Sequence, residues 1–333
     1  MRYLQNVHDM KKINLDLKDK KIMALLSQDA RIPLTQLAKR AGLSRDSVAY
    51  RIKNYEKEGI IQGYRTLVDI SKFGYSNYHL FIKLNDMSEN IEKKIITKLV
   101  KHPFIRAIIK FSGTFDFEIA LIARNTLELD SFITKIINDC SVYLADYEIL
   151  TIVKTYAAET FPPNFYNFEE KQTPFPLKEA KLDKKDIEIL KIIGEKALIP
   201  LHEIGHKTKL SADAVSYRIK NMVQSKVIIK FLPVVNYAAL SYNLYTLLLN
   251  VNALNENKEK ILKEFLSKDK NTLWAVKTLG RFNVLIYLLV KDVAQLQETI
   301  QKLRSLFPKQ LIHYDNLIAY EEFKYIYFPA DLF

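Results

Sequence analysis

The sequence contains a single cysteine, Cys140, among 333 residues. One thiol cannot form an internal disulfide, and it excludes Cys-based zinc sites and iron–sulfur clusters. Glycine is also scarce, with eight residues, and none of them belongs to a phosphate-binding loop. No apolar run approaches the ~18 residues of a membrane span, and the N-terminal MRYLQNVHDMKKINLDL lacks the apolar core of a signal peptide. We therefore expect a soluble, cytoplasmic, multidomain protein with no cofactor, metal or membrane partner.

The positive charge is confined to two segments. The chain carries 50 Lys and Arg against 38 Asp and Glu, a formal net charge of +12. Residues 1–65 have 14 basic and 7 acidic residues, and residues 178–232 have 12 and 7. These two segments account for the whole excess, so the remaining chain is neutral. Two basic modules on a neutral scaffold indicate two contact regions for a polyanion.

The sequence contains an internal repeat with an offset of 167 residues. Tyr50-Arg51-Ile52-Lys53-Asn54 recurs as Tyr217-Arg218-Ile219-Lys220-Asn221, and 23 of 70 positions are identical between residues 15–84 and 182–251. The same offset aligns Gly113 with Gly280 near the end of each copy. A constant offset over this length predicts duplication of a complete two-domain unit. The join at 160–181 holds four of the ten prolines and is typical of a semi-rigid linker.

Each copy combines two patterns of apolar residues. Residues 16–58 show three- and four-residue steps that predict three short helices, the third begun by the N-cap Ser44 and ended at Gly59. The strand-like IIQGYRTLVDI follows and completes a winged helix-turn-helix pattern. The rest of the copy predicts strand, helix, strand, strand, helix, strand, which is the ferredoxin-like order. Helices cover one face of such a sheet, so we expect the apolar other face to need a partner.

The third helix of each copy fits the major groove of double-stranded DNA. With Val48 at the centre of the buried side, Tyr50 and Lys53 point the opposite way. Arg45 is placed to read guanine, and Lys53 to neutralise phosphate. Arg51 and its counterpart border the apolar side, where an ion pair with a first-helix aspartate is an open alternative. The predicted DNA-binding residues are Thr35, Gln36, Ser44, Arg45, Ser47, Tyr50, Arg51, Lys53, Asn54, Ser211, Tyr217, Arg218, Lys220 and Asn221.

Residues 15–64 resemble the N-terminal domain of the leucine-responsive regulatory protein/AsnC family of transcription factors. The likeness includes the Leu-Ser start of the third helix, the Arg-Ile pair and the closing Gly-Ile-Ile-Gln-Gly-Tyr. It implies a transcriptional regulator of α+β class, in which a winged helix-turn-helix domain followed by a ferredoxin-like domain occurs twice as a covalent pseudo-dimer. The predicted segments are winged-helix domains at 1–65 and 182–232, ferredoxin-like domains at 66–160 and 233–333, and a linker at 161–181.

The resemblance also implies an amino-acid-like effector and assembly into homo-oligomers. Gly113, Thr114 and Asp116 match the family's Gly-x-Tyr-Asp turn and are the predicted effector-binding residues. The second copy departs from the pattern, with Ala212 in place of Arg45 and Asn283 in place of Asp116. We therefore expect asymmetric recognition, in which the first copy reads sequence and the second mainly anchors.

Two short sequence features also allow an enzyme interpretation. His202-Glu203-Ile204-Gly205-His206 spells the H-E-x-x-H string of zinc proteases, but the repeat places it on the short second helix, with Ile204 inward. Siroheme decarboxylases share the two-domain fold, yet HPFIRAIIKF and DKNTLWAVKT lack their paired histidines. We predict no catalytic residues. The siroheme-decarboxylase-like enzyme and a nucleoid-type architectural DNA-binding protein stay open as alternatives.

Overall fold

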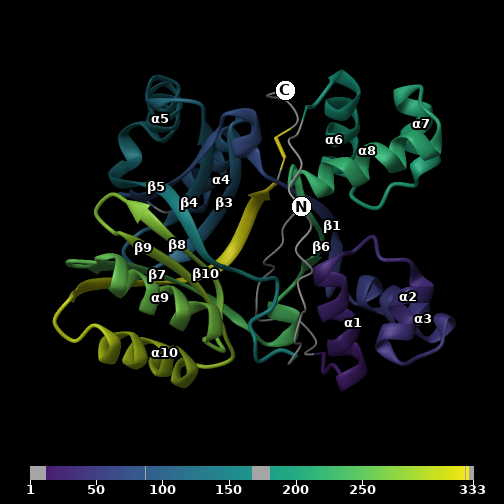
Figure 1. Ribbon diagram of the computed structural model, residues 1–333. Coiled ribbons are helices and arrows are strands. Elements are labelled where there is room, and N and C mark those ends of the chain that lie inside the picture. The colour runs from purple at the N-terminus through teal and green to yellow at the C-terminus, as the bar shows by residue number, and fades with distance from the viewer. Residues whose placement is uncertain (1–12, 87, 167–180, 327, 330–333) are drawn as a thin grey trace. The chain divides into compact units, whose positions relative to one another are not determined.

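The computed structural model describes residues 13–86, 88–166, 181–326, 328 and 329, and it divides into two compact units. The barrel unit contains the sheet domains of both copies, within residues 76–166 and 237–325. The winged-helix unit contains the helix-turn-helix domains of both copies, within residues 15–75 and 181–236 (Figure 1). Like domains are therefore grouped across the two copies. The predicted domain boundaries stay a prediction, and residues 167–180 of the predicted linker lie outside the described residues.

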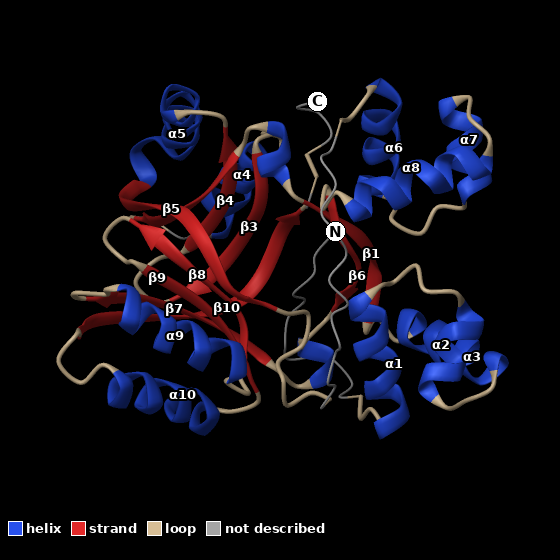
Figure 2. Ribbon diagram, viewed as in Figure 1, coloured by secondary structure: helices blue, strands red, loops and turns tan. Residues whose placement is uncertain are grey.

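Each winged-helix domain has three helices and a strand. The first has α1 (Leu17–Gln28), α2 (Leu34–Ala41), α3 (Arg45–Lys57) and β1 (Ile61–Val68). The second has α6 (Lys184–Glu195), α7 (Leu201–Thr208), α8 (Ala212–Gln224) and β6 (Ile228–Val235). Both first helices begin with the same aspartate capping box, in which two side chains accept each other's backbone N–H groups: Asp16 with Asp19, and Asp183 with Asp186. Figure 2 shows the two groups of helices flanking a pair of strands.

The strands β1 and β6 join the two winged-helix domains in one antiparallel pair. Their register sets Tyr64 opposite Pro233 and Thr66 opposite Phe231. The Thr66 hydroxyl, which is fully buried, donates to the Ile193 carbonyl of the other copy at 2.7 Å. Val68 of the first copy also packs in the apolar core of the second. The relative placement of the two helix-turn-helix domains is thus set inside one unit.

Arg31 adds a second link between the copies that has no symmetric equivalent. Its guanidinium donates to the carbonyls of Ala197 (2.8 Å) and Ile199 (3.1 Å) and lies 5.3 Å from the centre of the Phe231 ring. Burial lowers the pKa of Arg31, yet the two carbonyl contacts and the ring satisfy its charge. The residue at the equivalent position of the second copy is Leu198.

The barrel unit is built from two ferredoxin-like halves. The first contains β2 (Ser76–Leu84), α4 (Glu89–Leu99), β3 (Ile105–Ser112), β4 (Phe117–Ala123), α5 (Thr126–Cys140) and β5 (Leu144–Ala158). The second contains β7 (Asn243–Val251), α9 (Glu256–Lys268), β8 (Thr272–Leu279), β9 (Val284–Val290), α10 (Val293–Leu306) and β10 (Leu311–Tyr325). Three short 3-10 turns at Ile70–Phe73, Ser141–Tyr143 and Ala238–Leu240 complete the elements of the described chain. The predicted α+β class and the tandem order are confirmed.

The two halves close into one eight-stranded barrel with the order β10-β3-β4-β2-β5-β8-β9-β7. Both junctions pair the long last strand of one half with the second strand of the other, as β5 with β8 and β10 with β3. The expected partner for each uncovered sheet face is therefore the other half of the same chain. A cluster rich in phenylalanine fills much of the interior, with Phe81, Phe111, Phe115 and Phe282 each at most 1% exposed. Burying each such ring contributes roughly 1.5–3 kcal/mol.

Glycines at both junctions allow the two halves to approach each other closely. Gly280 has a φ of +141°, and an added Cβ would lie 2.6 Å from the Ile149 carbonyl oxygen of β5. Its counterpart Gly113 has a φ of +146° and lies against Leu317 and Asn316 of β10. A side chain at either position would need both an unfavourable backbone conformation and a displaced neighbouring strand.

We expect Gly280→Ala to lower the free energy of unfolding by more than about 2 kcal/mol, since the clash is with backbone. The matched control is Ala253→Gly in the same unit, where an exposed alanine holds a φ of +50°. This change should raise the free energy of unfolding by about 0.5–1 kcal/mol. Urea titrations monitored by circular dichroism measure the free energy of unfolding of both variants. Equal changes of the same sign would contradict the backbone clash expected at Gly280.

We expect Arg31→Ala to lower the free energy of unfolding of the winged-helix unit by about 2 kcal/mol, because two buried carbonyls lose a charged donor. Arg40→Ala is the control, because Arg40 is exposed and donates to the Gln28 side chain at 2.8 Å. The control should change stability by less than about 0.5 kcal/mol. Thermal unfolding of both variants compares them directly, and equal losses would show that the Arg31 link contributes nothing.

Candidate nucleic-acid interface

The helices α3 and α8 begin with the same serine cap. The Ser44 hydroxyl accepts the backbone N–H of Ser47 at 3.2 Å, and the Ser211 hydroxyl accepts that of Ala214 at 3.1 Å. Both serines lie in extended backbone, as an N-cap residue does. The cap leaves the positive end of the helix dipole next to the exposed first turn, where it favours a phosphate.

The two helices bury and expose equivalent residues. Val48 and Val215 are fully buried, whereas Tyr50 and Tyr217 are each 66% exposed. The predicted outward residues of α3, which are Asp46, Tyr50 and Lys53, are confirmed as exposed, and so are their counterparts Asp213, Tyr217 and Lys220 in α8. Arg45 and Ala212, in the first turn of each helix, are exposed as well. A large aromatic ring that stays in water on both copies is suited to contact with a partner.

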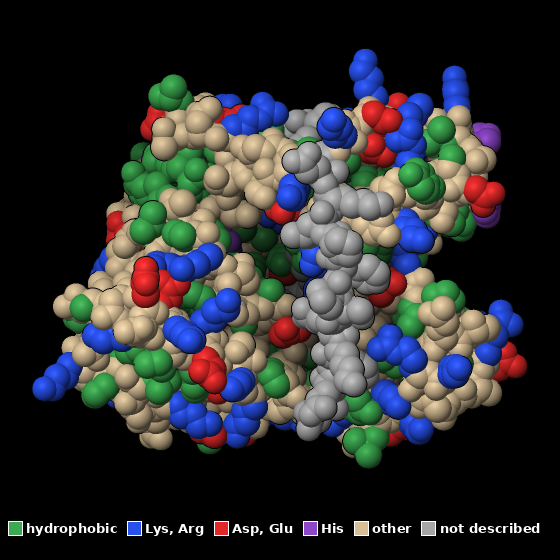
Figure 3. Space-filling model, in the orientation of Figure 1, with side chains coloured by type: hydrophobic (Ala, Val, Ile, Leu, Met, Phe, Trp, Pro, Cys, Tyr) green, Lys and Arg blue, Asp and Glu red, His purple; other side chains and the backbone are tan. Residues whose placement is uncertain are grey.

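The other predicted contact residues lie at the edge of this face. Thr35 and Gln36 are exposed in the first turn of α2. Ser47, Asn54 and Asn221 are half-buried beside the exposed rows of α3 and α8. Figure 3 shows Lys and Arg side chains projecting from both helix-turn-helix domains. Most of the predicted residues are thus exposed or half-buried on α2, α3 and α8, and their contact with DNA stays a prediction.

Arg51 and Arg218 form the structural ion pairs that the sequence left open. Arg51 donates to Asp16 at 2.9 Å and to Asp19, and Arg218 donates to Asp183 and Asp186 at 2.8 Å each. These hydrogen bonds raise the pKa of both guanidinium groups above the usual range. In each domain, the arginine thus links the third helix to the capping box of the first helix. A DNA contact for them stays a prediction.

The second copy holds two lysines in the left-handed backbone region. Lys209 has a φ of +58° where Gly42 has +68°, and Lys226 has a φ of +59° where Gly59 has +70°. A lysine in this conformation costs about 1 kcal/mol more than glycine. Both side chains are exposed. Lys209 was not predicted as a site residue, although the 167-residue offset aligns it with the helix-ending Gly42.

Asp116, one of the predicted effector residues, has structural partners. The buried Asp116 carboxylate accepts the Lys83 ammonium at 2.8 Å and the Leu84 backbone N–H at 2.7 Å. In the second copy Asn283 bonds both backbone groups of Val251 instead, at 2.9 and 2.8 Å. Gly113 and Thr114 form the turn between β3 and β4. The Asp-to-Asn change therefore keeps a link to the neighbouring strand, and effector binding here stays a prediction.

The H-E-x-x-H string lies on α7 as the repeat alignment predicted. Ile204 is fully buried, while His202, Glu203 and His206 are exposed. Among the described residues, no three His, Cys, Asp or Glu side chains could hold a metal ion together. Cys140 is fully buried, and desolvation raises the pKa of its thiol to about 12, which suppresses the reactive thiolate.

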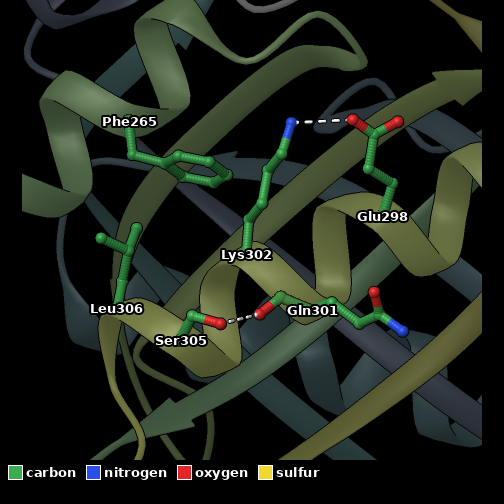
Figure 4. A pocket seen from close by; sticks show the side chains of 6 residues that line it. All are labelled: Phe265, Glu298, Gln301, Lys302, Ser305 and Leu306. Atoms are coloured by element: carbon green, nitrogen blue, oxygen red, sulfur yellow. Dashed lines mark hydrogen bonds and ion pairs between the residues drawn. The ribbon is translucent and has the colours of Figure 1, made fainter.

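An open pocket of about 500 Å³ lies on the outer surface of the barrel unit, beside α9 and α10. Figure 4 shows that Lys302 is paired with Glu298, and that the Ser305 hydroxyl donates to the Gln301 carbonyl. Phe265 and Leu306 line the rest of it. These neighbouring helical pairs are satisfied within the helix, so the pocket presents no activated nucleophile.

Among the described residues, none of the helices has the length and apolar character of a membrane span.

Comparison with known proteins gives the same two-copy pattern. The family of winged helix-turn-helix DNA-binding domains matches residues 15–62 and again residues 182–229. The chain is similar to the HTH-type transcriptional regulator LrpA of Pyrococcus horikoshii, with 33% identity over 122 residues, 36% of this chain and 84% of LrpA. It is also 30% identical to the leucine-responsive regulatory protein of Rhizobium meliloti, over 37% of this chain and 79% of that protein.

Among solved structures, the siroheme decarboxylase NirDL is similar to almost the whole chain. The superposition includes 93% of this chain and 93% of NirDL, with a TM-score of 0.59 and 16% sequence identity. At this identity the likeness shows a shared fold alone. The sequence likeness to the regulators is much greater and extends through most of their length. The chain therefore belongs to the leucine-responsive regulatory protein/AsnC family of HTH-type transcriptional regulators and carries that family's unit twice.

Proposed function

We propose that the protein is a transcriptional regulator that binds double-stranded DNA sequence-specifically, with both recognition helices supplied by one chain. The observation that carries the proposal is the matched pair of exposed faces on α3 and α8, held in one unit by the β1–β6 pair. Two helices of this kind suit successive major-groove segments of one duplex. Its site of action would be cytoplasmic DNA, and further assembly of chains is compatible with two recognition helices in each.

The two helices are proposed to have different tasks. The exposed first turn of α3 carries Arg45, whose side chain suits guanine with two hydrogen bonds, whereas α8 carries Ala212 there. The second copy has Lys209 and Lys226 where the first has glycine, and their exposed ammonium groups suit phosphate. Lysine is less favourable than glycine in this backbone conformation. Its presence at both positions therefore supports a functional role for its positive charge. The operator would thus have one strongly specified half-site and one anchoring half-site.

An amino-acid-like effector belongs to the proposal as the input of the regulator. The turn at Gly113–Asp116 is its proposed contact, although Asp116 is already bonded to Lys83 and to a strand. A ligand at this turn would have to compete with, or add to, those bonds.

The main test is duplex binding by the purified full chain as a function of salt. Binding should weaken steeply with ionic strength, because the lysines displace counterions from several phosphates. Discrete footprints on genomic fragments would support a regulator, whereas uniform coverage would support the architectural alternative. Absence of binding at low salt would overturn the proposal. Uptake of an iron tetrapyrrole with a coloured absorption band, without DNA binding, would favour the decarboxylase alternative.

We expect Lys53→Ala and Lys220→Ala each to weaken binding to all sequences by a similar factor, because they remove a phosphate contact. Each should lower the slope of log affinity against log salt by about 1. Lys93→Ala is the control, because Lys93 is exposed on α4 and pairs with Glu89 at 2.5 Å. Fluorescence anisotropy at several salt concentrations measures the slopes. An unchanged slope in both test variants would contradict the phosphate role.

We expect Arg45→Ala to cost about 1–3 kcal/mol on the preferred duplex and far less on unrelated DNA, because it removes a base contact. The converse change, Ala212→Arg, should add a new base preference in the second half-site. Selection of bound sequences from a random pool compares these variants with the unaltered chain. An Arg45→Ala variant that keeps the full base preference would show that other residues read the sequence.

A further inference from the structure

A carboxylate is enclosed inside the barrel, where an apolar residue would be simpler to accommodate. Glu118 lies on β4 and is 1% exposed. Its register partners are Phe81 and Ile109, which belong to the apolar cluster of the interior. An ionised carboxylate in such surroundings is strongly unfavourable unless donors compensate it. The partners of Glu118 therefore decide what this position can do.

One carboxylate oxygen is bonded and the other is not. Glu118 Oε1 accepts the hydroxyl of Tyr287 and contacts His79 Nδ1. His79 comes from the adjacent strand β2, whereas Tyr287 comes from β9 on the opposite wall of the barrel. The contacts therefore cross the interior. Glu118 Oε2 is buried and has no hydrogen-bond partner among the described residues. A buried carboxylate oxygen without a donor needs an explanation.

Aromatic rings lie near the Glu118 carboxylate. Trp274 of β8 stacks on the His79 ring, with the centres 5.5 Å apart and the planes 17° apart. It also packs against Tyr287, with the ring centres 4.9 Å apart. Thr246 of β7 faces Tyr287 in register, and its buried hydroxyl oxygen likewise has no partner among the described residues. The cluster thus offers two unused polar atoms and the faces of aromatic rings.

The interior is less tightly closed here than at the phenylalanine-rich cluster. Trp274 and Tyr287 are half-buried, and so are Ala120 of β4 and Ile152 of β5. Phe81 and Phe282, by contrast, are fully buried. Partial exposure of residues that face the interior indicates that this end of the barrel is reachable by small molecules.

The fold itself does not require this cluster, because the two copies contribute different residues at equivalent positions. The 167-residue offset aligns His79 with Thr246 and Glu118 with Leu285. It aligns the aromatic residues Trp274 and Tyr287 with Ala107 and Ala120. Each copy thus has large functional side chains where the other has small or apolar ones. Only the combination of both halves creates the site.

We propose that this cluster binds a small organic cation, an amine or guanidinium compound with a compact apolar body. The free Glu118 oxygen supplies a charge-assisted acceptor, and the Thr246 hydroxyl supplies a second polar contact. The ring faces of Trp274 and Tyr287 favour a cation over an anion. The half-buried Ile152 accommodates the apolar part. This site is separate from the turn at Gly113–Asp116, and the proposal does not depend on DNA binding.

Other occupants fit the residues less well. An anion would be repelled by Glu118, which has no described lysine or arginine bonded to it. A metal ion would find one imidazole and one carboxylate, and no described group of three ligating side chains is present. A bound water could donate to the free oxygen, but it would leave the aromatic faces unused.

Trp274 is the only tryptophan, so its fluorescence reports on this site alone. The full-length protein is titrated with benzylamine as the probe, with excitation at a wavelength that tyrosine and the probe do not absorb. A saturable change in emission is expected for benzylamine, and little or none for benzyl alcohol or benzoate. Isothermal titration calorimetry gives the affinity independently of fluorescence. Absence of saturable benzylamine binding, or equal binding of benzoate, would overturn the proposal.

The matched variants are Glu118→Gln and Glu259→Gln. Glu118→Gln keeps the size of the side chain and removes its charge, and it should weaken benzylamine binding at least tenfold. Glu259 lies on α9 and pairs with Lys154 and Lys277 outside the barrel, so its variant should bind normally. Circular dichroism checks the fold. If Glu118→Gln does not fold, Ala120→Leu serves instead, because it adds bulk on β4 beside His79, two residues from Glu118. Unchanged binding by the folded test variant would overturn the assignment.

Discussion

The pairing of β5 with β8 and of β10 with β3 is the constraint on which the barrel depends. Each ferredoxin-like half has one sheet face covered by its own helices and one apolar face without cover. The long strands β5 and β10, of 15 residues each, extend past their own half and hydrogen-bond to the other. Closure leaves no free sheet edge and buries both apolar faces. The same principle recurs in the winged-helix unit, where β1 pairs with β6. Because both pairings are intramolecular, they do not depend on protein concentration, unlike a dimer of separate chains.

Covalent duplication also releases the chain from exact symmetry. In a homodimer, every residue of a twofold interface appears twice, so a substitution on one side is necessarily made on the other. Here, equivalent positions have diverged. Arg31 anchors the second copy while Leu198 does nothing comparable, and Arg45 faces solvent where the second copy has Ala212. In the barrel, Glu118 has no acidic counterpart. The asymmetry in both units follows one pattern: one copy keeps a charged group, and the other supplies its surroundings or a different contact.

Much of this architecture could be predicted from sequence because its signals are local. Ser44 and Gly59 mark the ends of one helix, and the repeat transfers the assignment to Ser211 and Lys226. The buried position of Ile204 followed from the same alignment. The barrel junctions could not be predicted, because the register between β5 and β8 depends on residues far apart in sequence. Glu118, His79, Trp274 and Tyr287 were missed for the same reason: each is on a different strand. A position-by-position comparison of the copies would have exposed the exchange of Ala120 for Tyr287.

The proposed function requires that one chain bind both half-sites of a duplex by itself. Native mass spectrometry of the full chain with a minimal selected duplex tests it most directly, because it counts chains on each duplex. We expect one chain to occupy a duplex containing both half-sites, and a duplex cut to the first half-site to bind the same single chain more weakly. A complex that forms only with two chains on the full duplex, one for each half-site, would contradict it.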